Sequence, residues 1–179
     1  MKKIRKTADH KEINLNWTPP ENFHVTLVFL GDTDRNAIPE ICRKIQTAVV
    51  AHNAFKIKIR DIGGFPVLNQ ARVLYLGVQR NQAILDLQGE LETMLKPPEK
   101  REIDFVPHLT IARLRNPKSC RDLVSPFAHI DLGKQEVNEI TLYSSELRGG
   151  LVFYDKIQSF TLQDAAAETA QQEFSPVST

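Results

Sequence analysis

One short pattern occurs twice in this chain, and it constrains the fold more than any other feature. Residues 23–31 read FHVTLVFLG and residues 107–114 read PHLTIARL, so each copy places a His and a Thr two residues apart inside an apolar run. Side chains at positions i and i+2 of a β-strand point to the same face, roughly 6–7 Å apart. Packed cores exclude or pair such groups, so the two copies predict that both His and Thr pairs line one cleft.

Hydrophobic periodicity predicts a chain in which helices and strands alternate. We expect residues 1–22 to be a polar leader and Gly63–Pro66 to be a turn. Asn81 has the position and side chain of a helix N-cap. The expected strands cover about 23–30, 55–60, 72–78, 107–114, 137–143 and 151–161, and the expected helices about 36–51, 82–95 and 119–126.

The two motifs are 84 residues apart, and each is followed by a helix and further strands, as in an internal duplication. This predicts one bilobal domain over 1–179, with a first half at about 17–96 and a second at about 103–162. Similar lobes usually meet about a pseudo-twofold axis, and ligands tend to bind in the groove between them. Residues 163–179 have little to bury and are expected to be disordered.

Composition limits the class of protein and its partners. The 179 residues include 23 Lys and Arg against 22 Asp and Glu, so a nucleic acid would need a local basic patch. The cations Lys56, Lys58 and Arg60 share one face of a predicted strand; they could follow a phosphodiester backbone, but such a row is more often a solvated face. No apolar run approaches the ~20 residues of a membrane span, and the basic N-terminus lacks a signal-peptide core. With Cys42 and Cys120 as expected free thiols, the prediction is a cytoplasmic protein.

Two imidazoles and two hydroxyls together suit acid–base chemistry on an anion. Histidine ordinarily titrates near pH 6.5, so one ring of a pair can accept a proton while the other donates one. Phosphodiester cleavage needs such a base and acid in line, with hydrogen bonds to the remaining oxygens. A zinc site is the competing interpretation, but neither motif has a Cys, Asp or Glu at ligand spacing. A purely structural role for each His is the third interpretation.

Together with Gly64-Phe65-Pro66 and the apolar strand after Arg72, the two motifs resemble the paired signatures of the two-histidine phosphoesterases. The resemblance extends over about 17–162 and is to the branch of 2′-5′ RNA ligases and RNA 2′,3′-cyclic phosphodiesterases. It implies an α+β fold with two lobes, pseudo-symmetric antiparallel sheets, outer helices and a central cleft. It also implies an enzyme without metal or other cofactor, which opens a 2′,3′-cyclic phosphate at an RNA end to leave a 2′-phosphate, or joins tRNA halves through a 2′-5′ linkage.

The resemblance also implies roles for five residues. His24 would protonate the departing 3′ oxygen and His108 would activate water, although the sequence permits the reverse assignment. Thr26 and Thr110 would hold the phosphate, and Arg113 would add positive charge. In a regular strand, however, Arg113 points away from the face that carries His108, so it joins the site only if a bulge intervenes or the strand ends.

Other features are less constrained. Phe65 and Tyr143 are candidates for stacking on a terminal base, with core packing as the alternative. The family commonly begins with an apolar strand that residues 1–16 lack, which leaves substrate choice open. The remaining alternatives are a module that binds RNA ends without turnover and a phosphodiesterase for small cyclic nucleotides such as a cyclic ADP-ribose phosphate. The oligomeric state cannot be inferred from the sequence.

Overall fold

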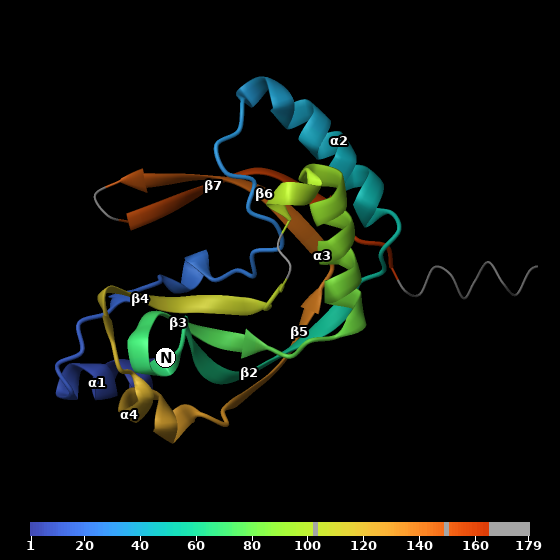
Figure 1. The fold of residues 1–179 in the computed structure, drawn as a ribbon. Coiled ribbons are helices and arrows are strands. Elements are labelled where there is room, and N and C mark those ends of the chain that lie inside the picture. The colour runs from blue at the N-terminus through green and yellow to red at the C-terminus, as the bar shows by residue number, and fades with distance from the viewer. Residues whose placement is uncertain (102–103, 149–150, 165–179) are drawn as a thin grey trace, which may run out of the picture. The chain divides into compact units, whose positions relative to one another are not determined.

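The computed structural model describes residues 1–101, 104–148 and 151–164. It contains helices together with strands that pair antiparallel, which confirms the α+β class. The helices are α1 (Lys2–His10), α2 (Ile38–Val49), α3 (Gln82–Leu95) and α4 (Arg121–Val124) (Figure 1). The strands are β1 (Asn16–Trp17), β2 (Phe55–Phe65), β3 (Ala71–Val78), β4 (His108–Lys118), β5 (Asp131–Val137), β6 (Glu139–Arg148) and β7 (Leu151–Thr161).

The chain forms two compact units, and each unit collects three separate segments. The first contains residues 1–26, 57–80 and 105–135, and the second contains 27–56, 81–104 and 136–179. Each unit therefore contains segments from both predicted halves, 17–96 and 103–162. The division of the chain into these two halves stays a prediction based on the repeat in the sequence. The predicted disordered tail lies outside the described residues from 165 onward, while Gln163 forms a parallel β-bridge with Asn53.

The first unit is built on a five-stranded sheet with the order β1-β4-β3-β2-β5. Strand β4 pairs antiparallel with both β1 and β3, and β3 pairs antiparallel with β2. Residues 63–65 continue β2 opposite β3, so the turn expected at Gly63–Pro66 starts later than predicted. One face of this sheet is apolar and carries the fully buried side chains of Leu74, Ile111 and Ala112.

Helix α1 covers that apolar face, which corrects the prediction that residues 1–22 are a leader. Ile4 and Ala8, one turn apart in the helix, are buried in the same core as Ile13 and Leu15. Helices α1 and α4 pack against each other on this side of the sheet (Figure 1). Only two apolar positions mark the helix in the sequence, and the charged residues around them conceal its buried stripe.

The first motif does not form the strand predicted for 23–30. Its residues form no regular strand, the chain bends at Leu27, and among the described residues only Val25 is bonded into a bridge, with Leu109 of β4. A 3-10 turn at Pro20–Asn22 leads into it. The motif therefore rests on β4 without becoming a regular member of the sheet.

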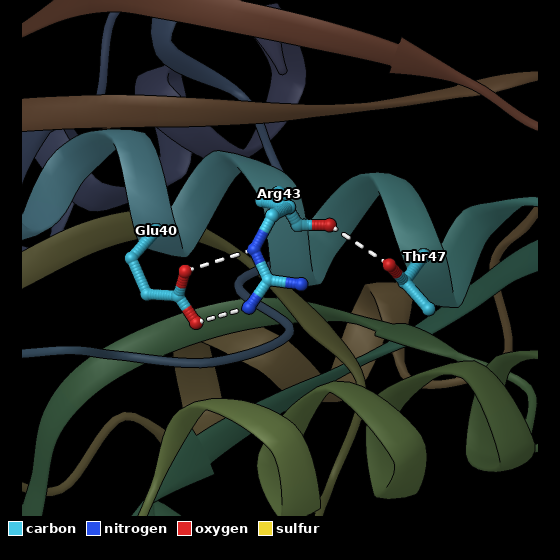
Figure 2. Close-up of polar contacts among 3 residues, drawn as sticks. All are labelled: Glu40, Arg43 and Thr47. Carbon is cyan, nitrogen blue, oxygen red and sulfur yellow. Dashed lines mark hydrogen bonds and ion pairs between the residues drawn. The ribbon is translucent and has the colours of Figure 1, made fainter.

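The second unit packs α2, α3 and the β6–β7 hairpin around a separate core centred on Val49, Leu87 and Phe160. Asn81 caps α3, as predicted: its Oδ1 accepts a hydrogen bond from the Ile84 amide at 3.0 Å. On the exposed face of α2, Arg43 donates two hydrogen bonds to the Glu40 carboxylate, and Thr47 donates to the Arg43 carbonyl (Figure 2). These contacts lie on the solvent side of α2, opposite the face that builds the core.

Candidate active site

The two motif histidines are held in the same way. Nδ1 of His24 lies 2.8 Å from the carbonyl oxygen of Asn22, and Nδ1 of His108 lies 2.7 Å from the carbonyl oxygen of Val106. A carbonyl oxygen can only accept, so Nδ1 carries the hydrogen in each ring. In the neutral imidazole, Nε2 is then the basic nitrogen, and each ring can exchange a proton there.

The bridge between Val25 and Leu109 brings the two motifs side by side within the first unit. In this antiparallel register His24 lies opposite Thr110, and Thr26 lies opposite His108. Leu109 packs on the apolar core, so the His and Thr side chains next to it point to the opposite face of the sheet. We call this the His/Thr face. The two imidazoles occupy a diagonal, along which residues are roughly 7–8 Å apart in a regular antiparallel pair and their β-carbons somewhat closer.

A bulge in β4 also brings Arg113 to the His/Thr face. Tyr75 pairs with Thr110, but the next residue along β3, Leu74, pairs with Ala112, so Ile111 is an extra residue in β4. Such an insertion reverses the alternation of the strand beyond it. Arg113 therefore lies opposite Val73, on the same face as Tyr75 and Thr110. In a regular strand Arg113 would point away from the face that carries His108, and this bulge places it on that face.

Ion pairing distinguishes Arg113 from the basic row on β2. Lys58 is bonded to Asp131 and Arg60 to Asp61, each at 2.8 Å, so acidic neighbours neutralise both. Arg113 is exposed and makes no ion pair or hydrogen bond with any residue in the described part of the chain. Thr26 and Thr110 likewise make no side-chain hydrogen bond there. These groups can therefore bind an anion without first breaking a contact inside the protein.

Two aromatic rings lie against His108. Phe65 is stacked on Tyr75 with ring centroids 4.4 Å apart, and the Phe65 ring is edge-on to the imidazole at 4.9 Å. Tyr75 itself is 5.3 Å from His108. The sequence singled out Phe65 but missed Tyr75, because only the strand register shows that Tyr75 faces Thr110.

Tyr143, the other predicted stacking residue, lies on β6 in the second unit. It is exposed, and its ring meets Tyr154 edge-on at 6.2 Å. Its expected role beside the histidines therefore stays a prediction. Elsewhere in the second unit, Nε2 of His52 lies 2.8 Å from the Glu90 carboxylate.

Two further features concern residues 1–101, 104–148 and 151–164. Within them, no group of three or more His, Cys, Asp or Glu side chains is arranged to hold a metal ion. None of the helices there combines the length and the hydropathy needed to cross a membrane. The His/Thr face itself offers two tethered imidazoles that can each accept or donate a proton at Nε2, together with two hydroxyls and a guanidinium that can bind an anion.

Solved structures share this fold. A crystal structure of a Thermus thermophilus protein superposes with a TM-score of 0.73 at 21% identity, covering 92% of this chain and 93% of that one. Escherichia coli LigT in complex with 3′-AMP gives 0.64 at 22% identity, with the same coverage.

Sequence comparison identifies the family. The RNA 2′,3′-cyclic phosphodiesterase of Methanothermobacter thermautotrophicus is 30% identical over 89% of both chains. That of Aquifex aeolicus is 31% identical over 89% of this chain and 88% of its own length. The model of the 2′-5′ RNA ligase superfamily matches residues 2–149, a range that includes both His-x-Thr motifs. The chain is therefore a member of the 2′-5′ RNA ligase superfamily.

Proposed function

We propose that this protein is an RNA 2′,3′-cyclic phosphodiesterase, which hydrolyses the cyclic phosphate at an RNA end to a 2′-phosphate. The observation that carries the proposal is the bridge between Val25 and Leu109. It sets two imidazoles, each tethered through Nδ1, on one diagonal of the sheet. A diagonal spacing of roughly 7–8 Å between the two residues would leave room for a phosphorus atom between the two Nε2 atoms.

The reaction follows from this arrangement. Nε2 of neutral His108 accepts a proton from water as the water oxygen attacks phosphorus. The bond to the 3′ oxygen breaks, and Nε2 of protonated His24 supplies the proton that this oxygen takes up. The product carries a 2′-phosphate and a free 3′-hydroxyl, and each ring ends in the protonation state from which the other began. With a ribose hydroxyl in place of water, the same steps form a 2′-5′ linkage.

Thr26, Thr110 and Arg113 would bind the phosphate. Each Thr lies directly across from the His of the other motif, so the two hydroxyls flank the same diagonal. Their hydrogen bonds to the non-bridging oxygens would hold phosphorus in line with both imidazoles. The guanidinium of Arg113 would stabilise the negative charge that grows on these oxygens in the transition state.

Hydrolysis of a defined RNA with a 2′,3′-cyclic phosphate end, assayed in EDTA, tests the proposal. Because each His transfers a proton in one step, His24→Ala and His108→Ala should each lower kcat by about 10²–10⁴-fold. His129→Ala is the matched control, since this exposed His lies outside both motifs. A 2′-phosphate product would mean that the 3′ oxygen leaves, as proposed, whereas a 3′-phosphate would mean that the 2′ oxygen leaves.

Two results would change the conclusion. Undiminished turnover in either single variant would remove that imidazole from the reaction. Tight binding of the cyclic end without any product would instead make the protein a recognition module for RNA ends. Parallel assays with a small cyclic nucleotide, including a cyclic ADP-ribose phosphate, decide whether the substrate is RNA or a mononucleotide.

We also infer a cytoplasmic location from the two cysteines. Cys42 and Cys120 are both free thiols. Free thiols are usual in the reducing cytoplasm, where disulfides are rare. Fractionation of cells that express the tagged protein tests this inference, and recovery outside the cytoplasm would contradict it.

A further inference from the structure

The two histidines have similar tethers but different surroundings. His24 is exposed, whereas His108 is partly buried against the rings of Phe65 and Tyr75. Strand register explains the difference: Phe65, Tyr75 and His108 lie on the same face of the neighbouring strands β2, β3 and β4. The approximate symmetry of the two motifs therefore ends at the side chains around them.

Gly63 makes room for this arrangement. It pairs with Tyr75, and a β-carbon built at Gly63 would lie 2.3 Å from Cζ of the Tyr75 ring. Real β-carbons do not approach a ring so closely, so the Tyr75 side chain lies where any other residue at position 63 would intrude. The sequence places Gly63 in a turn. In the structure it lies inside β2, where its lack of a side chain makes room for the Tyr75 ring.

We propose that Tyr75, seated on Gly63 and stacked on Phe65, is a positioning residue that fixes the imidazole of His108 for proton transfer. The inference rests on the proposed function, because it assigns Tyr75 a part in that reaction. Tyr75 acts through His108 and does not itself touch the reacting atoms.

The physical reason is that one hydrogen bond does not fix a ring. The bond from Nδ1 to the Val106 carbonyl holds one edge of the imidazole, but the χ2 torsion of histidine has a broad minimum. Rings at 4.9 and 5.3 Å restrict the remaining rotation by direct packing. A misplacement of about 1 Å at a reacting group can cost on the order of 10²-fold in rate.

The contribution of Tyr75 comes from its ring and not from its hydroxyl. Burial raises the pKa of Tyr75, so the phenol stays neutral across the range in which histidines titrate. Its hydroxyl makes no hydrogen bond with a residue in the described part of the chain. A phenylalanine at position 75 should therefore fill the same space, which separates ring packing from any chemistry of the hydroxyl.

Steady-state kinetics on the cyclic-phosphate RNA test the proposal. We expect Tyr75→Leu to lower kcat by about 10–100-fold with KM changed less than about threefold, because binding is kept and proton transfer is not. Tyr75→Phe should restore kcat to within about threefold of the natural chain. Phe153→Leu is the control for loss of an aromatic ring, since Phe153 is an exposed residue of the β6–β7 hairpin.

Gly63→Ala supplies a second test that leaves Tyr75 and His108 in the chain. The added methyl group must displace the Tyr75 ring, so kcat should fall as it does in Tyr75→Leu. If Tyr75→Leu does not fold, the kcat of Gly63→Ala and the proton NMR spectrum of the histidine rings in the natural chain test the proposal. Full kcat in a folded Tyr75→Leu or Gly63→Ala variant would overturn the proposal, as would equal losses in Tyr75→Leu and Tyr75→Phe.

Proton NMR of the histidine rings separates this inference from the proposed function. Two aromatic rings at about 5 Å should shift the ring protons of His108 from their positions in an unstructured peptide, and Tyr75→Leu should remove part of this shift. The absence of any such shift would overturn the packing on which the inference rests. A natural chain that shows the shift but turns over no cyclic phosphate would instead refute the proposed function.

Discussion

One extra residue in β4 decides where Arg113 points. Ile111 and Ala112 are consecutive in the chain, yet both are fully buried in the same core. A regular strand would turn one of them outward, so two successive buried residues are the local sign of the bulge. The sequence alone leaves this undecided, because a run of Ile and Ala before an Arg is equally compatible with a strand that ends.

Substitution of Arg113 tests whether this placement matters for the reaction. Arg113→Gln removes the charge that faces the two motifs, and we expect kcat/KM for the cyclic-phosphate RNA to fall by about tenfold or more. Arg113→Lys should recover part of the loss, because the charge returns without the paired N–H donors.

The matched control for Arg113 is Arg72→Gln. Arg72 is exposed on the neighbouring strand and belongs to neither motif. Equal losses in the two variants would mean that the effect is one of overall charge. No loss in either would exclude Arg113 from the site.

Among the helices, α3 begins at the N-cap that the sequence predicts at Asn81. Its Oδ1 accepts from the Ile84 amide, and its Nδ2 donates to the Lys56 carbonyl at 2.9 Å. Asn81→Ala removes both bonds and should lower the free energy of unfolding by about 1–2 kcal/mol, measured by urea denaturation. Asn36→Ala, at an exposed Asn whose side chain makes no bond with a described residue, should change stability far less.

Strand β5 carries a carboxylate whose effect on stability should depend on pH. The hydrogen bond from Lys58 and the Gly133 amide hold the pKa of Asp131 below its ordinary value. A lowered folded-state pKa stabilises the protein above the unfolded pKa, and this stabilisation is lost as pH falls through the folded one. Asp131→Asn should therefore reduce the urea midpoint slightly at pH 7, and the difference should disappear toward pH 3 and below.

Asp164→Asn is the control for this titration. Asp164 is exposed and forms no ion pair with a residue in the described part of the chain. Its substitution breaks no ion pair with a described residue, so at pH 7 it should change the urea midpoint less than Asp131→Asn does. A deficit in Asp131→Asn that persists unchanged in acid would show that the carboxylate charge is not its cause.

How well each element could be predicted depended on how much of its stabilisation is local. Helices α2 and α3 have long apolar stripes, and α3 has a cap, so both follow from the sequence. Helix α1 was missed because only Ile4 and Ala8 mark its buried side. The segment 23–30 was predicted as a strand from its apolar residues, but one bridge at Val25 is all the pairing it has.

In the whole molecule, the two motifs pair with each other through Val25 and Leu109, which their order along the chain does not indicate. The sequence shows two copies 84 residues apart and suggests that each belongs to its own half. In the structure, both histidines belong to the unit that contains residues 1–26 and 105–135, while the predicted division into halves stays a prediction. Pairing between distant segments decides this, and no local pattern in a single sequence reports it. The residue types of the site could be predicted, whereas the neighbours of each residue, such as Tyr75, could not.

The carbonyl tether of each histidine has a consequence for how such a site can arise. The acceptor lies only two residues upstream of the ring, in Asn22 for one and Val106 for the other. A stretch of three residues thus contains the side chain together with the atom that orients it. Copying that stretch elsewhere in a gene would transfer an already oriented proton carrier, and the new location would need to provide only a neighbouring strand.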